Sequence, residues 1–372
     1  MKILTVLHDF RGGGAEKVAV LLANEWRAQG YSSEILCMSE LGPFRALVDV
    51  AVPVICLEKR HAYEAISALV GLLRARKDAV VVAHLTHINV MSLLAGLLAR
   101  HPRVFVVEHS DFRRARSDRP TLAAAVGFTI APFLYARAQK VICVSQSVCD
   151  SIPWLPFARN RGACVIANPI DAVTSGVSEL GSISHPWFSD DIPVLVACGR
   201  FTLAKNYELM LRALPFILAR TPVRLIILGE GPERHRMEAL ATALGVSEII
   251  AFVGFQDKPA LFFSKARLFI SSSAWEGLPM TMIEALFAGA NMVVTQSCSD
   301  AAHLVNGGLF GACVDSRSPD CFADAIVREL GRPVASLSEK RAFLSKYSLP
   351  KIAAEYGALF ACAQSGVDKK LH

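Results

Sequence analysis

Apolar and polar positions follow two alternating patterns along this chain. Short apolar runs with the length of strands, such as residues 3–7 and 104–108, alternate with longer stretches, such as residues 15–28, in which apolar residues recur at helical spacing. Strands that alternate with helices in this way are typical of a parallel sheet covered by helices on both faces. The pattern therefore predicts an α/β fold.

This alternation occurs in both halves of the chain. In the first half we expect strands at residues 3–7, 33–38, 79–83, 104–108, 141–144 and 163–166, and helices at 15–28, 63–74, 89–99 and 121–138. In the second half we expect strands at residues 194–198, 223–228, 249–253, 268–271, 292–295 and 312–314, and helices at 206–219, 233–244, 259–264, 279–288, 321–330 and 351–363.

The length of 372 residues exceeds one ordinary core and suits two domains. Residues 171–191 are rich in Ser, Gly, Pro and acidic residues without a period, which indicates a linker. We expect a Rossmann-like domain at 1–170, a second Rossmann-like domain at 192–348, and a C-terminal helix in 349–372 that crosses back toward the first domain. Two such domains would face each other across a cleft that holds the ligand.

Composition excludes several classes of protein. The net charge of +6 is mild and no basic-aromatic repeat accompanies it, so we expect no nucleic-acid partner. The ten cysteines form no C-x-x-C pair, so we expect no zinc or redox site, but buried, reduced thiols in a cytoplasmic protein. The uncharged residues 120–136 are at the lower limit for a membrane span, and Gly127 and Pro132 interrupt them, which favours a core or interfacial helix.

Residues 272–289 concentrate the candidate chemistry. A strand runs into a loop with Glu276, Pro279 suits the first position of a helix, and Gly289 suits the residue after its end. A helix that begins in this way leaves backbone N–H groups unpaired at the positive end of its dipole, here those of Met280, Thr281 and Met282. Such donors form an anion site.

A second carboxylate, Glu284, lies at the edge of the apolar arc of this expected helix. A carboxylate in that position is costly unless something pairs with it. The segment thus offers a phosphate cradle flanked by Glu276 and Glu284, which suits a ligand with a diphosphate, a ribose and a sugar.

Glycines and cations follow other strands of the pattern. Gly13 and Gly14 come after the first strand, where a backbone without side chains can approach an anion, although a tight turn explains them as well. Arg200 and Lys205 bracket the loop after residues 194–198 and can clamp a diphosphate from two sides, although a solvated loop is the alternative.

Three further residues lie at expected strand ends. Glu230, in Leu228-Gly-Glu-Gly-Pro232, belongs either to a nucleotide pocket or to a structural turn, and Phe255 could present an aromatic face to a base. His109 ends the strand at 104–108, where an imidazole can hydrogen-bond a sugar hydroxyl or a phosphate oxygen, or can be an ordinary core histidine.

Taken in order, these motifs resemble the retaining glycosyltransferases of family 4, which have the GT-B fold. The resemblance covers nearly the whole chain, and the ordered set is specific although each motif is loose. It is carried by Glu276 and Glu284 at E-x7-E spacing, Gly199-Arg200 with Lys205, Gly229-Glu-Gly-Pro232, Val253-Gly-Phe255, Gly13-Gly-Ala-Glu16 and Asn168-Pro-Ile-Asp171.

The resemblance implies that the domain at 1–170 binds the acceptor and the domain at 192–348 binds the nucleotide sugar. It also implies a role for each matching residue. It implies that Glu284 binds the ribose, that Glu276 contacts the donor sugar, and that His109 lies near that sugar. It implies that Arg200 and Lys205 neutralise the diphosphate and that Gly13 and Gly14 close on it. It implies that the sugar and the distal phosphate are held by Leu278, Pro279, Met280 and Thr281. Glu230 and Phe255 would belong to the nucleotide pocket. The catalytic candidates are Glu276, His109, Arg200 and Lys205.

The resemblance also implies a front-face reaction that retains the anomeric configuration and needs no metal. The absence of a D-x-D at the expected strand end is consistent with metal independence. Leu278, Thr281 and Met282 lie where residues vary with the donor sugar. They leave the donor open, with UDP-N-acetylhexosamine or UDP-hexose preferred over GDP-mannose.

Arg113, Arg114, Arg116 and Arg119 cluster before the uncharged residues 120–136. Such a basic patch suits docking to anionic lipid, and a solvated loop before a core helix is the alternative. We expect a cytoplasmic protein, peripheral on the inner face of the cytoplasmic membrane, with a lipid-linked saccharide acceptor in cell-surface glycan biosynthesis.

Other functions remain open at this point. An NAD(P)-dependent oxidoreductase would have the same alternation of strands and helices. The sequence lacks the G-x-G-x-x-G motif of dinucleotide-binding proteins and the acidic residue after their second strand. A catalytically silent nucleotide-sugar-binding protein would need a broken motif, whereas Glu276 and Glu284 are both present. An epimerase of the same fold would need carboxylates for hydroxyl elimination, and the sequence offers no such set.

Overall fold

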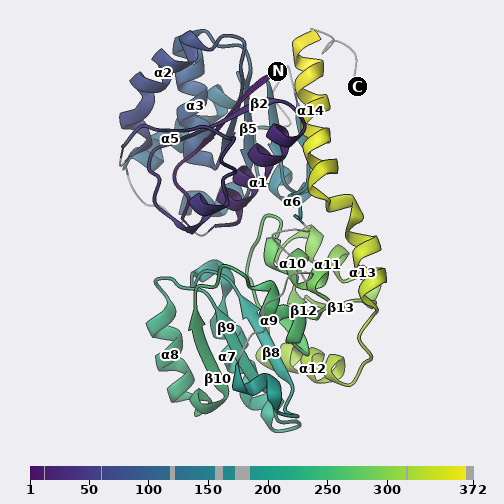
Figure 1. Ribbon diagram of the computed structural model, residues 1–372. Coiled ribbons are helices and arrows are strands. Elements are labelled where there is room, and N and C mark those ends of the chain that lie inside the picture. Colours follow the sequence, from purple (N-terminus) through teal and green to yellow (C-terminus); the bar gives the residue numbers. More distant parts are fainter. Residues whose placement is uncertain are drawn as a thin grey trace. The chain divides into compact units, whose positions relative to one another are not determined.

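The computed structural model describes residues 1–11, 13–59, 61–117, 122–155, 162–171, 185–315 and 317–365. The chain divides into two compact units (Figure 1). Unit 1 combines Met1–Pro169 with Tyr347–His372, and unit 2 is Ile170–Lys346. Both are α/β layers around a parallel sheet, as the alternating pattern predicts.

Unit 1 contains a seven-stranded sheet in the order β3-β2-β1-β4-β5-β6-β7, in which every described pair is parallel. Its strands are β1 (Lys2–Leu7), β2 (Ser32–Cys37), β3 (Val54–Cys56), β4 (Val80–His84), β5 (Val104–Glu108), β6 (Lys140–Cys143) and β7 (Ala163–Val165). Its helices are α1 (Gly14–Ala28), α2 (Ile66–Ala75), α3 (Thr86–Ala99), α4 (Phe112–Ser117), α5 (Leu122–Tyr135), α6 (Gln146–Asp150) and α14 (Leu349–Ser365).

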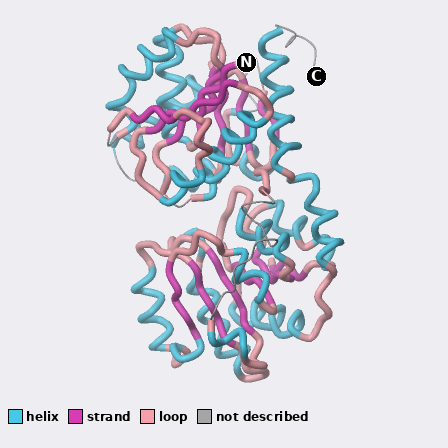
Figure 2. The backbone as a smooth tube through the Cα atoms, viewed as in Figure 1, coloured by secondary structure: helices cyan, strands magenta, loops and turns pink. Residues whose placement is uncertain are grey.

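Unit 2 contains a six-stranded parallel sheet in the order β10-β9-β8-β11-β12-β13. Its strands are β8 (Val194–Cys198), β9 (Arg224–Leu228), β10 (Ile250–Gly254), β11 (Leu268–Ser271), β12 (Asn291–Thr295) and β13 (Gly311–Val314). Its helices are α7 (Tyr207–Leu218), α8 (Arg234–Ala243), α9 (Ala260–Lys265), α10 (Met280–Ala288), α11 (Ser299–Leu304), α12 (Pro319–Leu330) and α13 (Leu337–Leu344). In each unit the strands lie together and the helices surround them (Figure 2).

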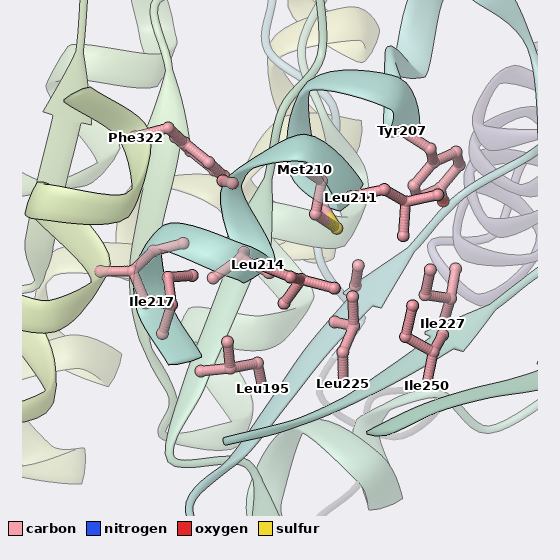
Figure 3. Packing of buried hydrophobic residues seen from close by; sticks show 14 of the residues in the cluster. Leu195, Tyr207, Met210, Leu211, Leu214, Ile217, Leu225, Ile227, Ile250 and Phe322 are labelled. Atoms are coloured by element: carbon pink, nitrogen blue, oxygen red, sulfur yellow. The ribbon is translucent and has the colours of Figure 1, made fainter. Parts of the chain in front are cut away.

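The core of unit 2 explains why its apolar runs form strands. Leu195 on β8 and Leu225 and Ile227 on β9 are buried against α7, whose buried residues recur at helical spacing (Figure 3). These α7 residues are Tyr207, Met210, Leu211, Leu214 and Ile217. Strands buried on both faces need apolar residues at every position, and this requirement produces the short uninterrupted runs in the sequence.

The last helix completes the core of unit 1. The buried indole of Trp26 on α1 donates a hydrogen bond to the Ala353 carbonyl of α14 at 3.3 Å, and it also packs edge-on against Tyr356 and Phe360. Phe360 contacts Phe105 of β5 as well, with ring centroids 4.9 Å apart. Thus α14 covers both a helix and a strand that lie far from it in the sequence.

The predicted strands and helices are confirmed with bounds that differ by a few residues. Sequence reasoning missed β3, α4, α6, α11 and α13, which are all short. In the expected linker, residues 172–184 lie outside the described residues, and Pro186–Ser189 forms a 3-10 turn. The prediction of buried thiols is right for Cys37, Cys143 and Cys298 and wrong for Cys321 and Cys362, which are exposed.

Candidate functional site

The strand order of unit 2 reverses at β8, which lies between β9 and β11. At such a switch point the chain leaves adjacent strands toward opposite sides, and a crevice opens at their carboxyl ends. The loop after β8 carries Gly199, Arg200 and Lys205, and the loop after β11 leads through Glu276 to α10. The topology therefore brings two motifs, distant in sequence, to one edge of the sheet.

Lys205 and Glu276 meet at this edge. Lys205 Nζ donates a hydrogen bond to Glu276 Oε1 at 2.5 Å, and Ser273 Oγ donates to the same oxygen at 2.7 Å. The backbone N–H of Glu276 donates to the Ser297 carbonyl at 3.1 Å. The carboxylate is thereby fixed in position beside a cation, and both side chains remain partly accessible.

The backbone around Lys205 is held as firmly as its side chain. Ser272 Oγ donates to the carbonyls of Lys205 and Asn206, and the N–H of Ala274 donates to the Ala204 carbonyl at 2.7 Å. Asn206 has a φ of 45°, a left-handed conformation that Asn tolerates better than most residues. The two loops are therefore joined by backbone as well as side-chain contacts.

The glycines of these loops permit close backbone approach. A Cβ on Gly229 would lie 2.1 Å from the Gly199 carbonyl oxygen, and one on Gly199 would lie 2.7 Å from Lys205 Cε. Both residues have positive φ, 137° for Gly229 and 156° for Gly199. Tyr207, the first residue of α7, donates a hydrogen bond from its OH to the Gly199 carbonyl at 2.9 Å and so supports the loop. A side chain at Gly229 would displace the Gly199 backbone at the start of the Lys205 loop, and one at Gly199 would displace the Lys205 side chain itself.

The remaining donor-binding candidates of unit 2 lie at the same edge. Arg200 is exposed, and Phe255 is 42% exposed after β10. Glu230 is exposed and pairs with Arg234, whose Nη2 also donates to the Phe252 carbonyl at 3.1 Å. Glu230 is thus tied to β10 through Arg234.

Helix α10 begins one residue later than expected. Pro279 is the N-cap residue in an extended conformation, not the first helical residue, and Met280 begins the helix. The N–H of Met282 donates to the Pro279 carbonyl at 3.1 Å, so the expected set of three unpaired amides is wrong for this residue. A 3-10 bond of this kind tightens the first turn. Of the three amides expected to form an anion site, those of Met280 and Thr281 remain candidates.

The rest of α10 matches the expectation. Gly289 caps its C-terminus with a φ of 103°. Leu278 and Met280 are buried, and Thr281 is partly buried. Glu284 is 5% exposed within the helix. This burial places its carboxylate where only specific partners can compensate for lost hydration.

In unit 1, Gly13 is the N-cap of α1 and Gly14 its first residue, and Gly12 lies outside the described residues. The carboxylate of Glu16 lies over Gly13, since a Cβ there would be 2.2 Å from Glu16 Oε2. An acidic group in the first turn interacts favourably with the helix dipole. The expected anion position at α1 is therefore covered by the chain's own carboxylate.

His109 follows β5 and contacts His84, the last residue of β4, at 2.9 Å between ring nitrogens. The preceding residue, Glu108, is buried and accepts hydrogen bonds from Thr86 Oγ1 at 2.8 Å, Asn89 Nδ2 at 2.8 Å and Tyr135 OH. Burial raises the pKa of Glu108, and these three donors oppose the shift. His109 thus lies next to a buried carboxyl network that joins β5 to α3 and α5.

The basic patch lies partly within the described residues. Arg113 and Arg114 are exposed on α4, whose start is capped by Asp111 Oδ1 accepting from their backbone N–H groups. Arg116 belongs to α4, and Arg119 lies outside the described residues. On the adjacent α5, Phe133 is 77% exposed and Val126 is also exposed. Among the described helices, none is long and apolar enough to span a membrane.

The structure brings together Lys205, Glu276, the loop glycines and the start of α10 within unit 2. It places His109, Gly13, Gly14 and the basic patch in unit 1. Within the described ranges, no three His, Cys, Asp or Glu side chains gather as ligands for a metal ion. Sequence reasoning missed Ser273, Tyr207 and His84, because a serine, a tyrosine or a histidine at a strand end is not by itself a signal.

Two family models match the chain. Residues 12–173 match the model described as Glycosyltransferase Family 4, and residues 185–348 match the model described as Glycosyl transferases group 1. The two matches are consecutive and correspond to the two α/β units.

Individual relatives match parts of the chain. The lipopolysaccharide core biosynthesis glycosyltransferase LpsE of Rhizobium meliloti is 35% identical over 137 residues, which are 37% of this chain and 39% of that protein. The N-acetylgalactosamine-N,N'-diacetylbacillosaminyl-diphospho-undecaprenol 4-alpha-N-acetylgalactosaminyltransferase of Campylobacter jejuni is 29% identical over 228 residues, 61% of this chain and 60% of that protein. The chain therefore aligns with less than two thirds of the length of each of these relatives.

The fold is also that of solved glycosyltransferase structures. HepE of Anabaena, solved with UDP and glucose, superposes with a TM-score of 0.78 at 19% identity and covers 97% of this chain and 99% of its own. The two consecutive family matches, the partial relatives and this shared fold agree with the ordered motifs, and the chain belongs to the family 4 glycosyltransferases, which have the GT-B fold.

Proposed function

We propose that this protein transfers a sugar from a nucleotide diphosphate sugar to a saccharide acceptor with retention of the anomeric configuration. The observation that carries the proposal is the Lys205–Glu276 pair beside the start of α10, at the switch point of the unit 2 sheet. Ligands of open α/β sheets bind at such a point.

The chemistry of sugar transfer matches this set of groups. The leaving nucleotide diphosphate gains negative charge as the glycosidic bond breaks, and the sugar carbon becomes oxocarbenium-like. Lys205 and Arg200 supply positive charge, and the first amides of α10 supply dipoles directed at an anion. Glu276, fixed by Ser273, is positioned to accept hydrogen bonds from sugar hydroxyls. Glu284 is proposed for the ribose, and Glu230 and Phe255 for the nucleotide pocket.

We propose UDP-N-acetylhexosamine or UDP-hexose as donor, with GDP-mannose second. The named activity of the Campylobacter relative, an N-acetylgalactosaminyltransferase, and the UDP bound in the Anabaena structure support this order. We further propose that protein cations alone balance the diphosphate, so that transfer needs no divalent metal. Activity that survives EDTA but falls when Arg200 is replaced is the expected result.

We propose a lipid-linked saccharide acceptor and peripheral docking on the inner face of the cytoplasmic membrane, in cell-surface glycan biosynthesis. The Campylobacter relative is named for a diphospho-undecaprenol acceptor. In this chain, Arg113 and Arg114 on α4 lie beside α5 with its exposed Phe133. A basic patch with an apolar neighbour suits an anionic lipid surface.

Nucleotide binding tests the donor proposal directly. In thermal-shift measurements on the full-length protein, we expect stabilisation by UDP, less by GDP and none by NADH. Arg200→Ala and Glu284→Gln should weaken the UDP effect, whereas Arg212→Ala, an exposed arginine on α7, should not. Absence of a shift with every nucleotide would contradict the proposal.

Transfer itself is tested by UDP release from a panel of donors with a lipid-linked saccharide. Lys205→Met should lower kcat by about 100-fold or more, since losing one group that stabilises transition-state charge has effects of that size. The anomeric configuration of the product, read by NMR, checks retention. A product of inverted configuration would overturn that part of the proposal.

A further inference from the structure

Two imidazoles lie ring to ring at the carboxyl ends of β4 and β5. His84 Nδ1 and His109 Nε2 are 2.9 Å apart, and the rings are stacked with centroids 5.2 Å apart. His84 is fully buried, and His109 is partly buried. Neighbouring parallel strands place the two residues together, although they are 25 positions apart in the sequence.

Both rings are neutral near neutral pH. Burial lowers the pKa of His109 to about 3 and holds the pKa of His84 well below its usual value, and the neighbouring His109 ring lowers the pKa of His84 further. In a neutral pair a single proton lies between the two facing nitrogens, so one ring donates and the other accepts. The outer nitrogens, His84 Nε2 and His109 Nδ1, are buried without a hydrogen-bond partner among the described residues.

The two arrangements of this proton differ in what they leave unpaired. If His109 donates, the deeply buried His84 Nε2 carries an N–H without a partner. If His84 donates, that atom keeps only a lone pair, and the N–H moves to His109 Nδ1 on the less buried ring. Each arrangement leaves one N–H and one lone pair without a partner, and the unpaired N–H is the costlier of the two. The second arrangement puts that N–H on the less buried ring, so it is the favoured one.

The surrounding chain holds this geometry at the expense of backbone strain. Leu85, between His84 and α3, has a φ of 79°, which is unfavourable for a leucine. After Leu85, the side chains of Thr86 and Asn89 donate hydrogen bonds to Glu108, next to His109. Before Leu85, His84 contacts His109 itself. The β4–α3 turn is therefore joined to the end of β5 on both sides of the strained residue. Backbone strain of this kind is common at functional sites, and an unpaired buried polar atom calls for an explanation.

We propose that His84 is a positioning residue that fixes His109 as the Nδ1–H tautomer. This inference rests on the proposed function and on the role that the family resemblance implies for His109: the imidazole would then offer a substrate hydroxyl a hydrogen-bond donor and could not act as a base. His109 Nδ1 is buried, so a hydroxyl reaches it after local rearrangement. Free histidine prefers the Nε2–H form, and the proposal therefore has a spectroscopic signature.

The test uses the full-length protein labelled with ¹⁵N-histidine, with the His109 signals assigned by their loss in His109→Gln. Nitrogen chemical shifts at neutral pH distinguish the two tautomers without any substrate. We expect Nδ1–H in the wild type, Nδ1–H in His84→Asn, whose side-chain amide can still donate near the original position, and Nε2–H in His84→Leu. His101→Leu, which removes another buried histidine of unit 1 before β5, should leave the His109 tautomer unchanged.

Kinetics provide the second measurement. His84→Leu should lower kcat at least tenfold with little change in UDP binding, because the proposed UDP site lies in unit 2, and His84→Asn should recover most of the rate. An Nε2–H tautomer in the wild type, or an unchanged tautomer in His84→Leu, would overturn the inference. The NMR result stands apart from catalysis, so a confirmed tautomer in a protein without transfer activity would refute the proposed function alone.

Discussion

Lys205 Nζ and Glu276 Oε1 lie 2.5 Å apart, although 71 positions separate the two residues in the sequence. The pair joins the loop after β8 to the loop after β11, and neither side chain is freely solvated. A bound diphosphate would compete with Glu276 for Lys205. The pair therefore links the stability of unit 2 to the charge balance of the proposed donor site.

The first prediction concerns this coupling. Lys205→Met leaves a partly buried carboxylate with Ser273 as its remaining hydrogen-bond donor from a side chain, and we expect a loss of about 1–3 kcal/mol in the free energy of unfolding. Glu276→Gln should lower the free energy of unfolding by less in the Lys205→Met background than in the wild type. The difference between the two losses, which is the coupling energy of the pair, should be about 1 kcal/mol. Urea denaturation of the two single variants and the double variant measures it. Strictly additive losses would mean that the pair contributes nothing.

The second prediction concerns Gly229. Alanine there would place Cβ 2.1 Å from the Gly199 carbonyl oxygen at a φ of 137°, so the loop carrying Lys205 must move. We expect Gly229→Ala to destabilise the protein by more than about 2 kcal/mol and to weaken UDP binding. Gly245→Ala is the matched control, since it has a positive φ of 68° but no atom within 4 Å of the added Cβ. Its cost should be about 1 kcal/mol, with UDP binding unchanged.

The third prediction concerns Lys340 on α13. This lysine is fully buried, its Nζ donates to the Gly289 carbonyl at the end of α10 at 2.6 Å, and burial lowers its pKa from 10.5 to about 8. Between these values the unfolded chain binds more protons than the folded one, so this residue makes stability rise with pH.

Compared with Lys340→Met, the wild type should therefore gain up to about 3 kcal/mol of unfolding free energy between pH 8 and 10.5, and no pH-dependent difference should appear at lower pH. Chemical denaturation across this range measures the gain. Lys265→Met, at an exposed lysine of α9, is the control and should show no such difference. A flat difference for Lys340→Met would show that the lysine is charged throughout.

The fourth prediction concerns the carboxyl network in unit 1. Tyr135→Phe removes one of the donors that favour ionised Glu108, so the pKa of Glu108, already raised by burial, rises further. A raised folded pKa makes stability fall as pH increases through that value. We expect a loss of about 1–3 kcal/mol at pH 8 and a smaller loss at pH 5, measured by urea denaturation. Tyr63→Phe, at an exposed tyrosine, should change neither value.

The fifth prediction concerns the membrane. Wild-type protein should float with vesicles that contain anionic lipid and stay behind with neutral ones, and Arg113→Glu with Arg114→Glu should abolish flotation, because charge repulsion replaces attraction. Arg27→Glu with Arg100→Glu changes the same charge elsewhere on unit 1 and should retain flotation. Equal flotation of both variants, or none by the wild type, would contradict the proposed docking.

The sequence predicts the sheets well because a strand buried on both faces has few alternatives to apolar residues, as in β4 and β8. It predicts α10 from Pro279 and Gly289, but not the hydrogen bond that engages Met282, since that depends on the conformation of the N-cap. The short α13 was missed despite Ser336 and Glu339, which form a capping box. Such short segments bury too few residues to show a period.

The site is less predictable than the fold for a related reason. Motif residues such as Glu276 and Lys205 are visible one at a time, but their contact depends on the strand order, which local patterns do not encode. His84 and Ser273 carry no motif at all, and their importance follows from what they touch. A single sequence does not show which residues far apart in the chain contact each other.

Helix α14 gives the chain an unusual order of assembly during synthesis. All residues of unit 2 emerge from the ribosome before residues 349–365, which supply the partners of Trp26 and Phe105. Domains generally fold as units once their residues are available. The unit translated first is thus completed last, and a released chain truncated after residue 346 should already protect the unit 2 core from proteolysis while Trp26 still lacks its cover.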